Sequence, residues 1–389
     1  MCNFATPKHT IDMTDTNQLQ QAFAARYGGH GTAYSAPGRI NLIGEHTDYN
    51  GGFVFPGAVT QGITAMLRPS GTPHVRLHAA DLQRDCSFDI DDPCGPADVN
   101  FRYVYGVVRE LTAAGLPIGG FDAVYGGDVP LGAGMSSSAA LESCFATALN
   151  DLFGGSLDRM ALARIGQATE HKYVGVKCGI MDQFASMHGR AGSLMRLDCR
   201  SGDFRYFPWH PDGYRLLLVN SCVRHELVGS PYNERRASCE RVAALAGVAT
   251  LRDCSWEMLE ALKNRLGADD YRRARYVLGE VDRVMAVSQA LEQGDYEEVG
   301  RQMYLTHEGL ARDYEVSCPE LDFLVDEARR MGVSGARLMG GGFGGCTINL
   351  VRNTLCDSFV TEVQRSYRAR FGIDCQPIPV VIGDGARRL

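Results

Sequence analysis

The order of helical and strand-like segments is the feature of this sequence that most restricts its fold. Short alternating segments typical of strands occur at residues 62–67 and 75–78. The pattern is mainly helical from residue 234 to 314, and strand-like segments follow at 346–351 and 377–382. Because helices are grouped apart from short strands, we predict an α+β fold rather than a doubly wound α/β sheet.

The length of the chain and a break in its pattern suggest two domains. A chain of 389 residues can form two domains that each bury a core. Residues 201–213 are rich in Pro, Gly and Asp and precede a strand-like segment at 214–220. We therefore place a domain boundary in this run, which gives an N-terminal domain at 1–210 and a C-terminal domain at 211–389.

Local patterns predict the elements of the first domain. Helical spacing predicts helices at 16–27 and 100–114, another just after the serines at 136–138, and one at 159–174 that ends in a loop at 175–183. A strand is expected at 121–125. The segments at 62–67 and 75–78 are expected to be antiparallel strands with one solvated face.

Charge and cysteine usage exclude several classes of function. A formal net charge of −7 gives no basic footprint for nucleic acid or an anionic membrane. The 13 cysteines include no CxxC pair and no cluster at zinc spacing, so we expect reduced thiols in a cytoplasmic protein. The sequence shows neither a signal peptide nor an apolar stretch of about 18 residues, which predicts no membrane span.

The stretch Ser35–Pro56 concentrates polar side chains in a loop. Arg39, Glu45, His46 and Asp48 lie within ten positions, between glycines and prolines that turn the backbone, and only residues 40–43 resemble a strand. Two carboxylates and an imidazole held together can accept hydrogen bonds from neighbouring hydroxyls of a sugar. From this segment alone, a surface loop with a capping aspartate and an ordinary ion pair fits equally well.

A second motif, residues 128–139, has the features of a phosphate-binding loop. Glycine turns precede three serines at the start of a predicted helix, where free backbone N–H groups and the helix dipole favour an anion. A plain serine N-cap is the alternative. The P-loop pattern is absent, so a triphosphate here needs other charge, and one serine hydroxyl could ligate Mg²⁺. Glu170, near the end of the next helix, and Asp182 are candidates to approach the phosphates.

A third glycine cluster, residues 340–345, contains the letters GxGxxG. We reject a dinucleotide site, because a strand-like segment rather than a helix follows and no ribose-binding acid stands about twenty residues on. A tight turn between core strands, close to another site, is expected instead.

Four motifs together resemble the GHMP kinases. They are PGRINLIGEHTDYNGG at 37–52, PLGAGMSSSA at 130–139, CGIMDQFAS at 178–186 and RLMGGGFGGC at 337–346. The first of them resembles the signature of the galactokinase family, and the motifs cover nearly the whole chain. The resemblance implies a two-domain GHMP kinase fold with the active site in the interdomain cleft and a ferredoxin-like C-terminal domain.

The resemblance also implies an activity and roles for individual residues. The expected reaction is ATP-dependent phosphorylation of the anomeric hydroxyl of galactose, the first step of its catabolism, with Mg²⁺. Asp182 matches the catalytic base and Arg39 the cation that supports the transition state. The sugar would be bound by Glu45, His46, Thr47, Asp48, Gly179 and Tyr232, the ATP phosphates by Gly132, Ala133, Gly134, Met135, Ser136, Ser137 and Ser138, and Mg²⁺ by Ser138 and Glu170.

The chemistry of these side chains agrees with such roles. Phosphoryl transfer needs alignment and positive charge at the transferring group, which Arg39 can supply. A guanidinium beside Asp182 would also keep that carboxylate ionised and able to take a proton. Met135 stands where a leucine is usual, which conserves volume. Met339 stands where many relatives have threonine, so any contact of that hydroxyl is lost.

Alternatives remain open at this stage. A sister enzyme that uses N-acetylgalactosamine or arabinose would share the carboxylates of the sugar loop. A non-catalytic galactose sensor would resemble the family closely, although intact serines at 136–138 and Asp182 argue against it. We expect small-molecule substrates, no nucleic-acid or membrane partner, and a monomer, although the sequence does not fix the oligomeric state.

Overall fold

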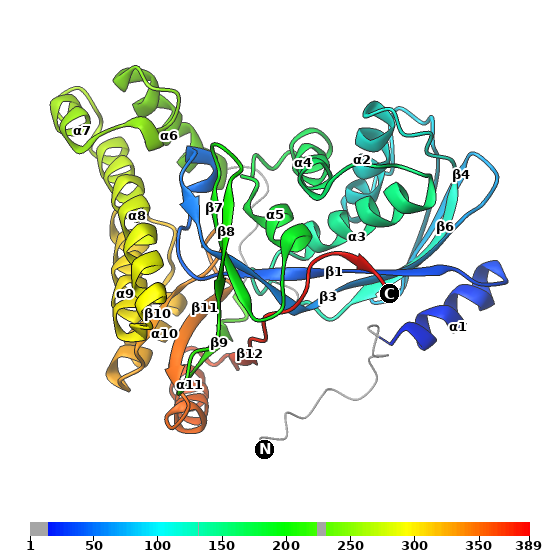
Figure 1. Ribbon diagram of the computed structural model, residues 1–389. Helices are drawn as coiled ribbons and strands as arrows, with labels where there is room; N and C mark the ends of the chain where they lie inside the picture. Colours follow the sequence, from blue (N-terminus) through cyan, green and yellow to red (C-terminus); the bar gives the residue numbers. More distant parts are fainter. Residues whose placement is uncertain (1–14, 131, 224–230) are drawn as a thin grey trace.

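The computed structural model describes residues 15–130, 132–223 and 231–389 (Figure 1). The helices are α1 (Thr16–Tyr27), α2 (Val99–Ala113), α3 (Ser137–Leu152), α4 (Arg159–Thr169), α5 (Met181–His188), α6 (Pro231–Ala246), α7 (Trp256–Leu262), α8 (Ala268–Gln293), α9 (Tyr296–Arg312), α10 (Pro319–Arg330) and α11 (Cys356–Phe371). The strands are β1 (Thr32–Asn41), β2 (Phe53–Val54), β3 (Pro56–Pro69), β4 (His74–Ala79), β5 (Arg84–Asp89), β6 (Phe121–Gly127), β7 (Ser193–Asp198), β8 (Phe204–Pro208), β9 (Tyr214–Asn220), β10 (Gly335–Leu338), β11 (Cys346–Arg352), β12 (Gln376–Pro379) and β13 (Arg387–Arg388).

The N-terminal half is built on a sheet with the order β13-β1-β3-β6-β4-β5. Helices α3 and α5 pack on β1 and β3, and α2 and α4 lie above them in Figure 1. The other face is covered as well, because Leu19 and Phe23 of α1 pack against Met66 of β3 and Val124 of β6. The predicted solvated face is therefore wrong for the middle of this sheet, because α1 buries it.

Strand pairing corrects two further expectations. β4 lies antiparallel to β5 but parallel to β6, so the first-domain strands are not all antiparallel. β1 runs from Thr32 to Asn41, well beyond the strand expected at 40–43, because the chain absorbs Pro37 and Gly38 in a register shift between Pro37 and Arg39. A β-bulge of this kind re-aims the side chains that follow it.

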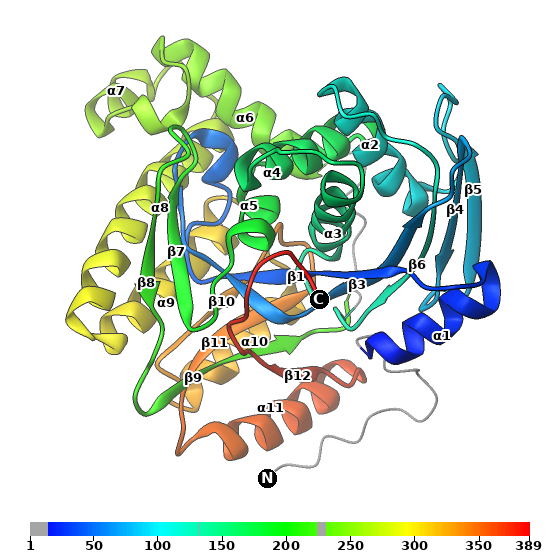
Figure 2. The same ribbon diagram turned by 45° about the vertical axis from the view of Figure 1, so that its right-hand side comes forward.

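The second sheet, with the order β10-β11-β9-β12, is antiparallel and covered on both faces. Leu216 and Leu218 of β9 pack with residues of α8 and α9, whereas Leu217 and Val219 pack with residues of α10 and α11. Figure 2 shows α11 beneath this sheet and α8 at its side. This arrangement of helices and short strands is the predicted α+β class.

The C-terminal end of the chain crosses back to the first sheet. Ile382 bridges Val59 of β3, and β13 pairs with β1. The division at residue 210 stays a prediction, and the last residues of 211–389 pair within the sheet that β1 and β3 build.

Most predicted elements are present, with shifts at their ends. The expected helix at 159–174 consists of α4 and a π-helical turn at Glu170–Val174. The expected loop at 175–183 ends early, because α5 begins at Met181 and places Asp182 in its first turn. The Pro- and Gly-rich run at 201–213 contains β8, which pairs with β7. Within the described parts of the chain, no helix is long and apolar enough to cross a membrane.

Candidate active site

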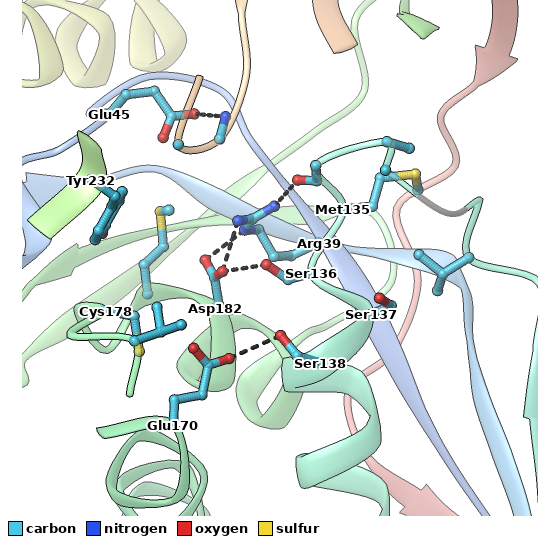
Figure 3. A pocket seen from close by; sticks show the side chains of 18 of the residues that line it. Arg39, Glu45, Met135, Ser136, Ser137, Ser138, Glu170, Cys178, Asp182 and Tyr232 are labelled. Atoms are coloured by element: carbon cyan, nitrogen blue, oxygen red, sulfur yellow. Dashed lines mark hydrogen bonds and ion pairs between the residues drawn. The ribbon is translucent and has the colours of Figure 1, made fainter. Parts of the chain in front are cut away.

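A cavity of about 290 Å³ lies where loops of both halves of the chain meet (Figure 3). The sugar loop (residues 42–55), the serine loop (residues 128–138), the segment 170–182, Tyr232 and the third glycine loop (residues 339–345) all contribute to its wall. Of the predicted site residues, it is lined by Arg39, Glu45, His46, Asp48, Gly132, Ala133, Gly134, Met135, Ser136, Ser137, Ser138, Glu170, Asp182 and Tyr232. The sugar loop, the serine loop and the third glycine loop therefore meet at one cavity.

Arg39 and Asp182 form a bidentate ion pair in this cavity. Nε of Arg39 lies 2.7 Å from Oδ1 of Asp182, and Nη2 lies 2.8 Å from Oδ2. Nη1 of Arg39 donates to the carbonyl of Gly134, and Oγ of Ser136 donates to Asp182 (Figure 3). Parallel N–H···O bonds fix both planes, so the carboxylate has one defined orientation toward the serine loop.

The bulge in β1 explains how Arg39 reaches this position. The backbone N–H of Arg39 donates to the carbonyl of Met135 over 3.0 Å. A Cβ on Gly38 would lie 2.6 Å from the same carbonyl oxygen, so only glycine permits this approach of strand and loop. The end of β1 and the serine loop are thereby in direct backbone contact.

Ser138 and Glu170 pair at the start of α3. Oγ of Ser138 donates to Oε1 of Glu170 over 2.9 Å (Figure 3). Burial raises the pKa of Glu170 to about 7, and the negative charge of Asp182 adds to this rise. Glu142, fully buried one turn along α3, accepts from Nε2 of Gln183. Burial also raises the pKa of Glu142 well above its usual value, so a cation bound at the N-terminus of α3 would favour the ionised forms of Glu142 and Glu170.

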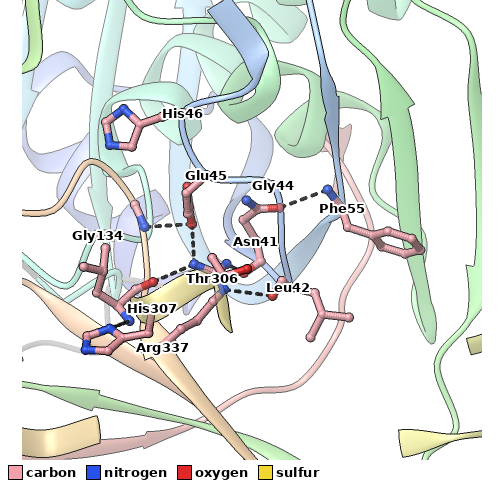
Figure 4. Close-up of polar contacts among 12 residues, drawn as sticks. Asn41, Leu42, Gly44, Glu45, His46, Phe55, Gly134, Thr306, His307 and Arg337 are labelled. Atoms are coloured by element: carbon pink, nitrogen blue, oxygen red, sulfur yellow. Dashed lines mark hydrogen bonds and ion pairs between the residues drawn. The ribbon is translucent and has the colours of Figure 1, made fainter. Parts of the chain in front are cut away.

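Glu45 is held by a buried arginine of the C-terminal half (Figure 4). Nη1 of Arg337 lies 3.1 Å from Oε1 of Glu45, and the backbone N–H of Gly340 donates to the same oxygen over 2.9 Å. Arg337 is completely buried and donates its remaining bonds to the carbonyls of Asn41, Leu42 and Leu338. Glu45 therefore links the sugar loop to the third glycine loop.

The backbone of the sugar loop rests on a second buried acid. Oε1 of Glu280, on α8, accepts from the N–H groups of Gly44 and Glu45 over 2.8 and 3.3 Å. Its Oε2 accepts from Nε of Arg283 and from the hydroxyl of Thr306. Charge and hydrogen bonds at Glu280 are thus balanced, as buried carboxylates require.

His46 and Asp48 occupy different environments in the same loop. Nδ1 of His46 lies 2.7 Å from the hydroxyl of Tyr49, and its ring packs 5.3 Å from that of Tyr232. Burial lowers the pKa of His46 to about 3, so the imidazole is neutral. Burial, followed by repulsion from Asp182, raises the pKa of Asp48 to about 7.

Two predicted sugar contacts lie beside the cavity rather than on its wall. The Thr47 hydroxyl is buried and donates to the carbonyls of Gly44 and Phe53, so it stabilises the loop itself. Gly179 lies directly against Asp48 and lines a neighbouring cavity.

Sequence reasoning missed several residues that shape the site. Arg337 and Glu280 lie far along the chain from Glu45. The only sequence signal for a role in the site is that each is a charged residue among apolar ones. Tyr103, on α2, also lines the cavity. Such partners become visible only once the tertiary contacts are known.

Comparison with known proteins gives this site a class. A model of the GHMP kinase N-terminal domain matches residues 102–190, and one of the GHMP kinase C-terminal domain matches residues 287–367. The fold and the serine loop are those of this class. The chain is therefore a GHMP kinase, and ATP is the phosphoryl donor of that class.

More specific matches define the family within the class. A galactokinase galactose-binding signature matches residues 21–69. The chain is 40% identical to a galactokinase of Exiguobacterium sibiricum, with 97% of this chain and 99% of that protein covered. It is 41% identical to a human galactokinase, over 90% and 91% of the two chains.

A solved structure agrees with these matches. Lactococcus lactis galactokinase, crystallised with galactose, superposes with a TM-score of 0.92 at 34% identity, covering 96% of this chain and 99% of that one. The chain belongs to the galactokinase family, and the predicted family, fold class and enzyme class are confirmed.

Proposed function

We propose that the cavity transfers the γ-phosphoryl group of ATP to the anomeric hydroxyl of galactose, with Asp182 as the general base. The observation that carries this proposal is the Arg39–Asp182 pair, which lies between the sugar loop and the serine loop. A base must stand within hydrogen-bond reach of the hydroxyl it deprotonates and close to the transferred group. Asp182 accepts from Ser136 of the serine loop and lines the same cavity as Glu45 and Asp48 of the sugar loop.

The proposed step balances as a single displacement. The anomeric oxygen attacks the γ-phosphorus, Asp182 takes the hydroxyl proton, and the bond from phosphorus to the β,γ-bridging oxygen breaks to release ADP. Arg39 remains charged throughout and faces the negative charge that spreads over the transferring group. Its bidentate bond fixes the orientation of the Asp182 carboxylate before the step.

The serine loop and Glu170 suit the triphosphate and Mg²⁺. Backbone N–H groups at the N-terminus of α3 can receive phosphate oxygens. Ser138 and Glu170 offer a hydroxyl and a carboxylate to Mg²⁺, which usually takes one or two protein ligands and completes its shell with phosphates and water. Within the described ranges no cluster of three or more His, Cys, Asp or Glu side chains could hold a metal alone. Bound Mg²⁺ would neutralise phosphate charge.

The sugar loop suits a polyhydroxylated ligand. Glu45 uses Oε1 for Arg337 and Gly340, and Oε2 can accept from a sugar hydroxyl. Asp48 can accept from another when ionised, and Tyr232 covers the ring of His46. These contacts are our proposal for galactose recognition. Thr47 and Gly179 then support the loop, and galactose need not touch their side chains.

The cellular compartment and the oligomeric state of the protein are also part of this proposal. No disulfide links the described cysteines, which fits the reducing cytoplasm. We retain a monomer as the prediction for the oligomeric state.

Asp182→Asn tests the assignment of the base. The amide keeps the size of the side chain but cannot take the proton, so we expect kcat to fall by about 10²–10⁴-fold. Galactose affinity measured by calorimetry should change by less than about fivefold. The control is Asp326→Asn, on the exposed face of α10. Turnover close to that of the unmodified enzyme would rule out Asp182 as the base.

A further inference from the structure

A chain of buried hydroxyl groups connects His46 to the C-terminal half of the protein. The Tyr49 hydroxyl lies 2.7 Å from Nδ1 of His46 and 2.7 Å from the hydroxyl of Tyr314. Sγ of Cys239, on α6, lies 3.2 Å from the same Tyr314 hydroxyl. At its other end, Nε2 of His46 lies 3.3 Å from the carbonyl oxygen of Gly341. Both His46 and Gly341 line the cavity.

The carbonyl of Gly341 gives this chain one direction. A carbonyl oxygen can only accept, so Nε2 of His46 must carry the hydrogen. A neutral imidazole has one N–H, which leaves Nδ1 as an acceptor for the Tyr49 hydroxyl. Tyr314 then donates to Tyr49, and the Cys239 thiol donates to Tyr314. The reverse direction would point the lone pair of Nε2 at the Gly341 oxygen.

The members of this chain keep their hydrogens. Burial lowers the pKa of His46 to about 3, with a further contribution from the positive charge of Arg235. Burial raises the pKa of Tyr49 and that of Tyr314 well above their ordinary values. The imidazole is therefore neutral and both phenols are protonated near neutral pH.

We propose that the Gly341 carbonyl selects the Nε2–H tautomer of His46, and that Tyr49, backed by Tyr314, is a positioning residue that donates to Nδ1 and holds the ring as a hydrogen-bond donor to the sugar. This inference rests on the proposed galactose site. Three of the side chains that line the cavity with His46, those of Glu45, Asp48 and Asp182, are carboxylates, and the guanidinium of Arg39 bonds to Asp182 and to the carbonyl of Gly134. A sugar hydroxyl that donates to a carboxylate still has lone pairs free, and His46 supplies the N–H that they need.

The geometry leaves this N–H available. A distance of 3.3 Å from Nε2 to Gly341 is long for an N–H···O bond, so the hydrogen is only weakly engaged. A sugar oxygen in the cavity could share or take it. The opposite tautomer would present a fourth acceptor to hydroxyl groups already facing three carboxylates.

Packing allows the hydroxyls to be removed without loss of shape. The rings of His46 and Tyr314 lie 4.9 Å apart, and those of Tyr314 and Tyr276 lie 4.8 Å apart. The ring of Tyr49 lies 5.8 Å from that of His46, so phenylalanine at position 49 or 314 keeps these ring contacts and deletes only the oxygen. Tyr367→Phe is the matched control, because Tyr367 is fully buried and donates to the carbonyl of Ser221 in a separate core.

The first measurement reads the tautomer directly and does not depend on activity. Nitrogen-15 NMR of protein labelled at histidine distinguishes a protonated from an unprotonated ring nitrogen, and His46→Gln assigns the signal among the ten histidines. We expect the Nε2–H form in the unmodified protein and in Tyr367→Phe. Tyr49→Phe should keep the Nε2–H form but shift the Nδ1 resonance, because the lone pair of Nδ1 loses the Tyr49 donor. Thermal melts confirm that each variant is folded.

The second measurement asks whether the tautomer and position of His46 affect KM for galactose. KM for galactose should rise roughly fivefold in Tyr49→Phe, less in Tyr314→Phe and not in Tyr367→Phe, with KM for ATP unchanged. A series of deoxygalactoses identifies the hydroxyl that His46→Gln makes dispensable. The penalty for removing that hydroxyl should shrink in Tyr49→Phe, as expected for coupled groups.

Two results would overturn the inference. One is an Nδ1–H imidazole in the unmodified protein, or an Nδ1 resonance unchanged in Tyr49→Phe. The other is an equal rise of KM for galactose in Tyr49→Phe and Tyr367→Phe. Failure of the galactose proposal itself would appear differently, as an absence of galactose turnover in the unmodified enzyme with the tautomer result intact.

Discussion

Glu45 performs two tasks with one carboxylate. Its Oε1 receives hydrogen bonds from Arg337 and Gly340, and it lies 2% exposed beside a fully buried guanidinium. Such a pair gives little net stability against apolar residues, but breaking it leaves an uncompensated buried charge. The pair therefore fixes the sugar loop against the third glycine loop. The free-energy cost of burying either charge is offset only while the other charge is present.

Arg337→Met should show this cost. Removing the guanidinium leaves Glu45 and the carbonyls of Asn41 and Leu42 without their donors, so we expect the free energy of unfolding to fall by about 3–5 kcal/mol. Urea denaturation measures the change. Arg352→Met is the control, because Arg352 pairs with Glu297 on the surface and its loss should leave the midpoint unchanged. Equal midpoints for the two variants would contradict the account.

Asp48 gives galactose binding a dependence on pH. Burial and repulsion from Asp182 raise the pKa of Asp48 to about 7 in the free enzyme, and the sugar needs the ionised form. Affinity should therefore weaken as the pH falls below 7, and binding near pH 6 should release a proton. Because the folded pKa exceeds the unfolded value, this group also stabilises the free fold at low pH and loses that contribution between about pH 4 and 7.

Calorimetry at pH 6 in two buffers of different ionisation enthalpy measures the proton release. Asp48→Asn should bind galactose more weakly and release no proton. Proton release that persists in Asp48→Asn would show that another group titrates.

Among the elements, the loops of the site depend on close backbone approach. The third glycine loop joins β10 to β11 and supplies the Gly340 N–H to Glu45, while the bulge in β1 brings Arg39 N–H to the carbonyl of Met135. The segment before α5 shows the same requirement, because a Cβ on Gly179 would lie 1.9 Å from Oδ2 of Asp48. Small residues at these points let three loops share one cavity.

Gly179→Ala tests the contact between this segment and the sugar loop. The methyl group must displace the Asp48 carboxylate, so we expect KM for galactose to rise by about tenfold while KM for ATP stays within about twofold. Gly267→Ala is the control, because it precedes α8 with an ordinary backbone conformation and a Cβ there would have no neighbour within 4 Å. A comparable change in both KM values would indicate general misfolding instead.

The sequence predicts helices and strands whose apolar residues recur at regular spacing. It does not predict those whose conformation depends on contacts with distant parts of the chain. The helix that starts after the serines, α3, follows from apolar residues at helical spacing. The start of α5 falls within the loop expected at 175–183, because glycines precede it and its helical conformation depends on packing against α3 and α4. The sequence does not predict the full length of β1, because Pro37 and Gly38 are poor strand residues. They are extended only because the strand pairs with β3.

For the whole molecule, the site joins residues that lie far apart in the chain. One cavity is lined by Arg39, Ser136, Asp182 and Gly340. The C-terminal strand β13 pairs with β1 and forms the edge of its sheet. Periodicity and local chemistry could identify the serine loop and the sugar loop, and resemblance to GHMP kinases connected them. Arg337, Glu280 and the chain from His46 to Cys239 required the folded structure, because nothing in local spacing relates them.

The central claim is that this assembled cavity phosphorylates galactose through Asp182. The most direct test is galactose-dependent ADP formation in the presence of Mg²⁺, with N-acetylgalactosamine and arabinose as competing substrates and Asp182→Asn as the inactive control. The account predicts efficient turnover of galactose, a far lower kcat/KM for the other two sugars, and galactose 1-phosphate as the product. No galactose-dependent ADP, or preferred turnover of another sugar, would contradict it.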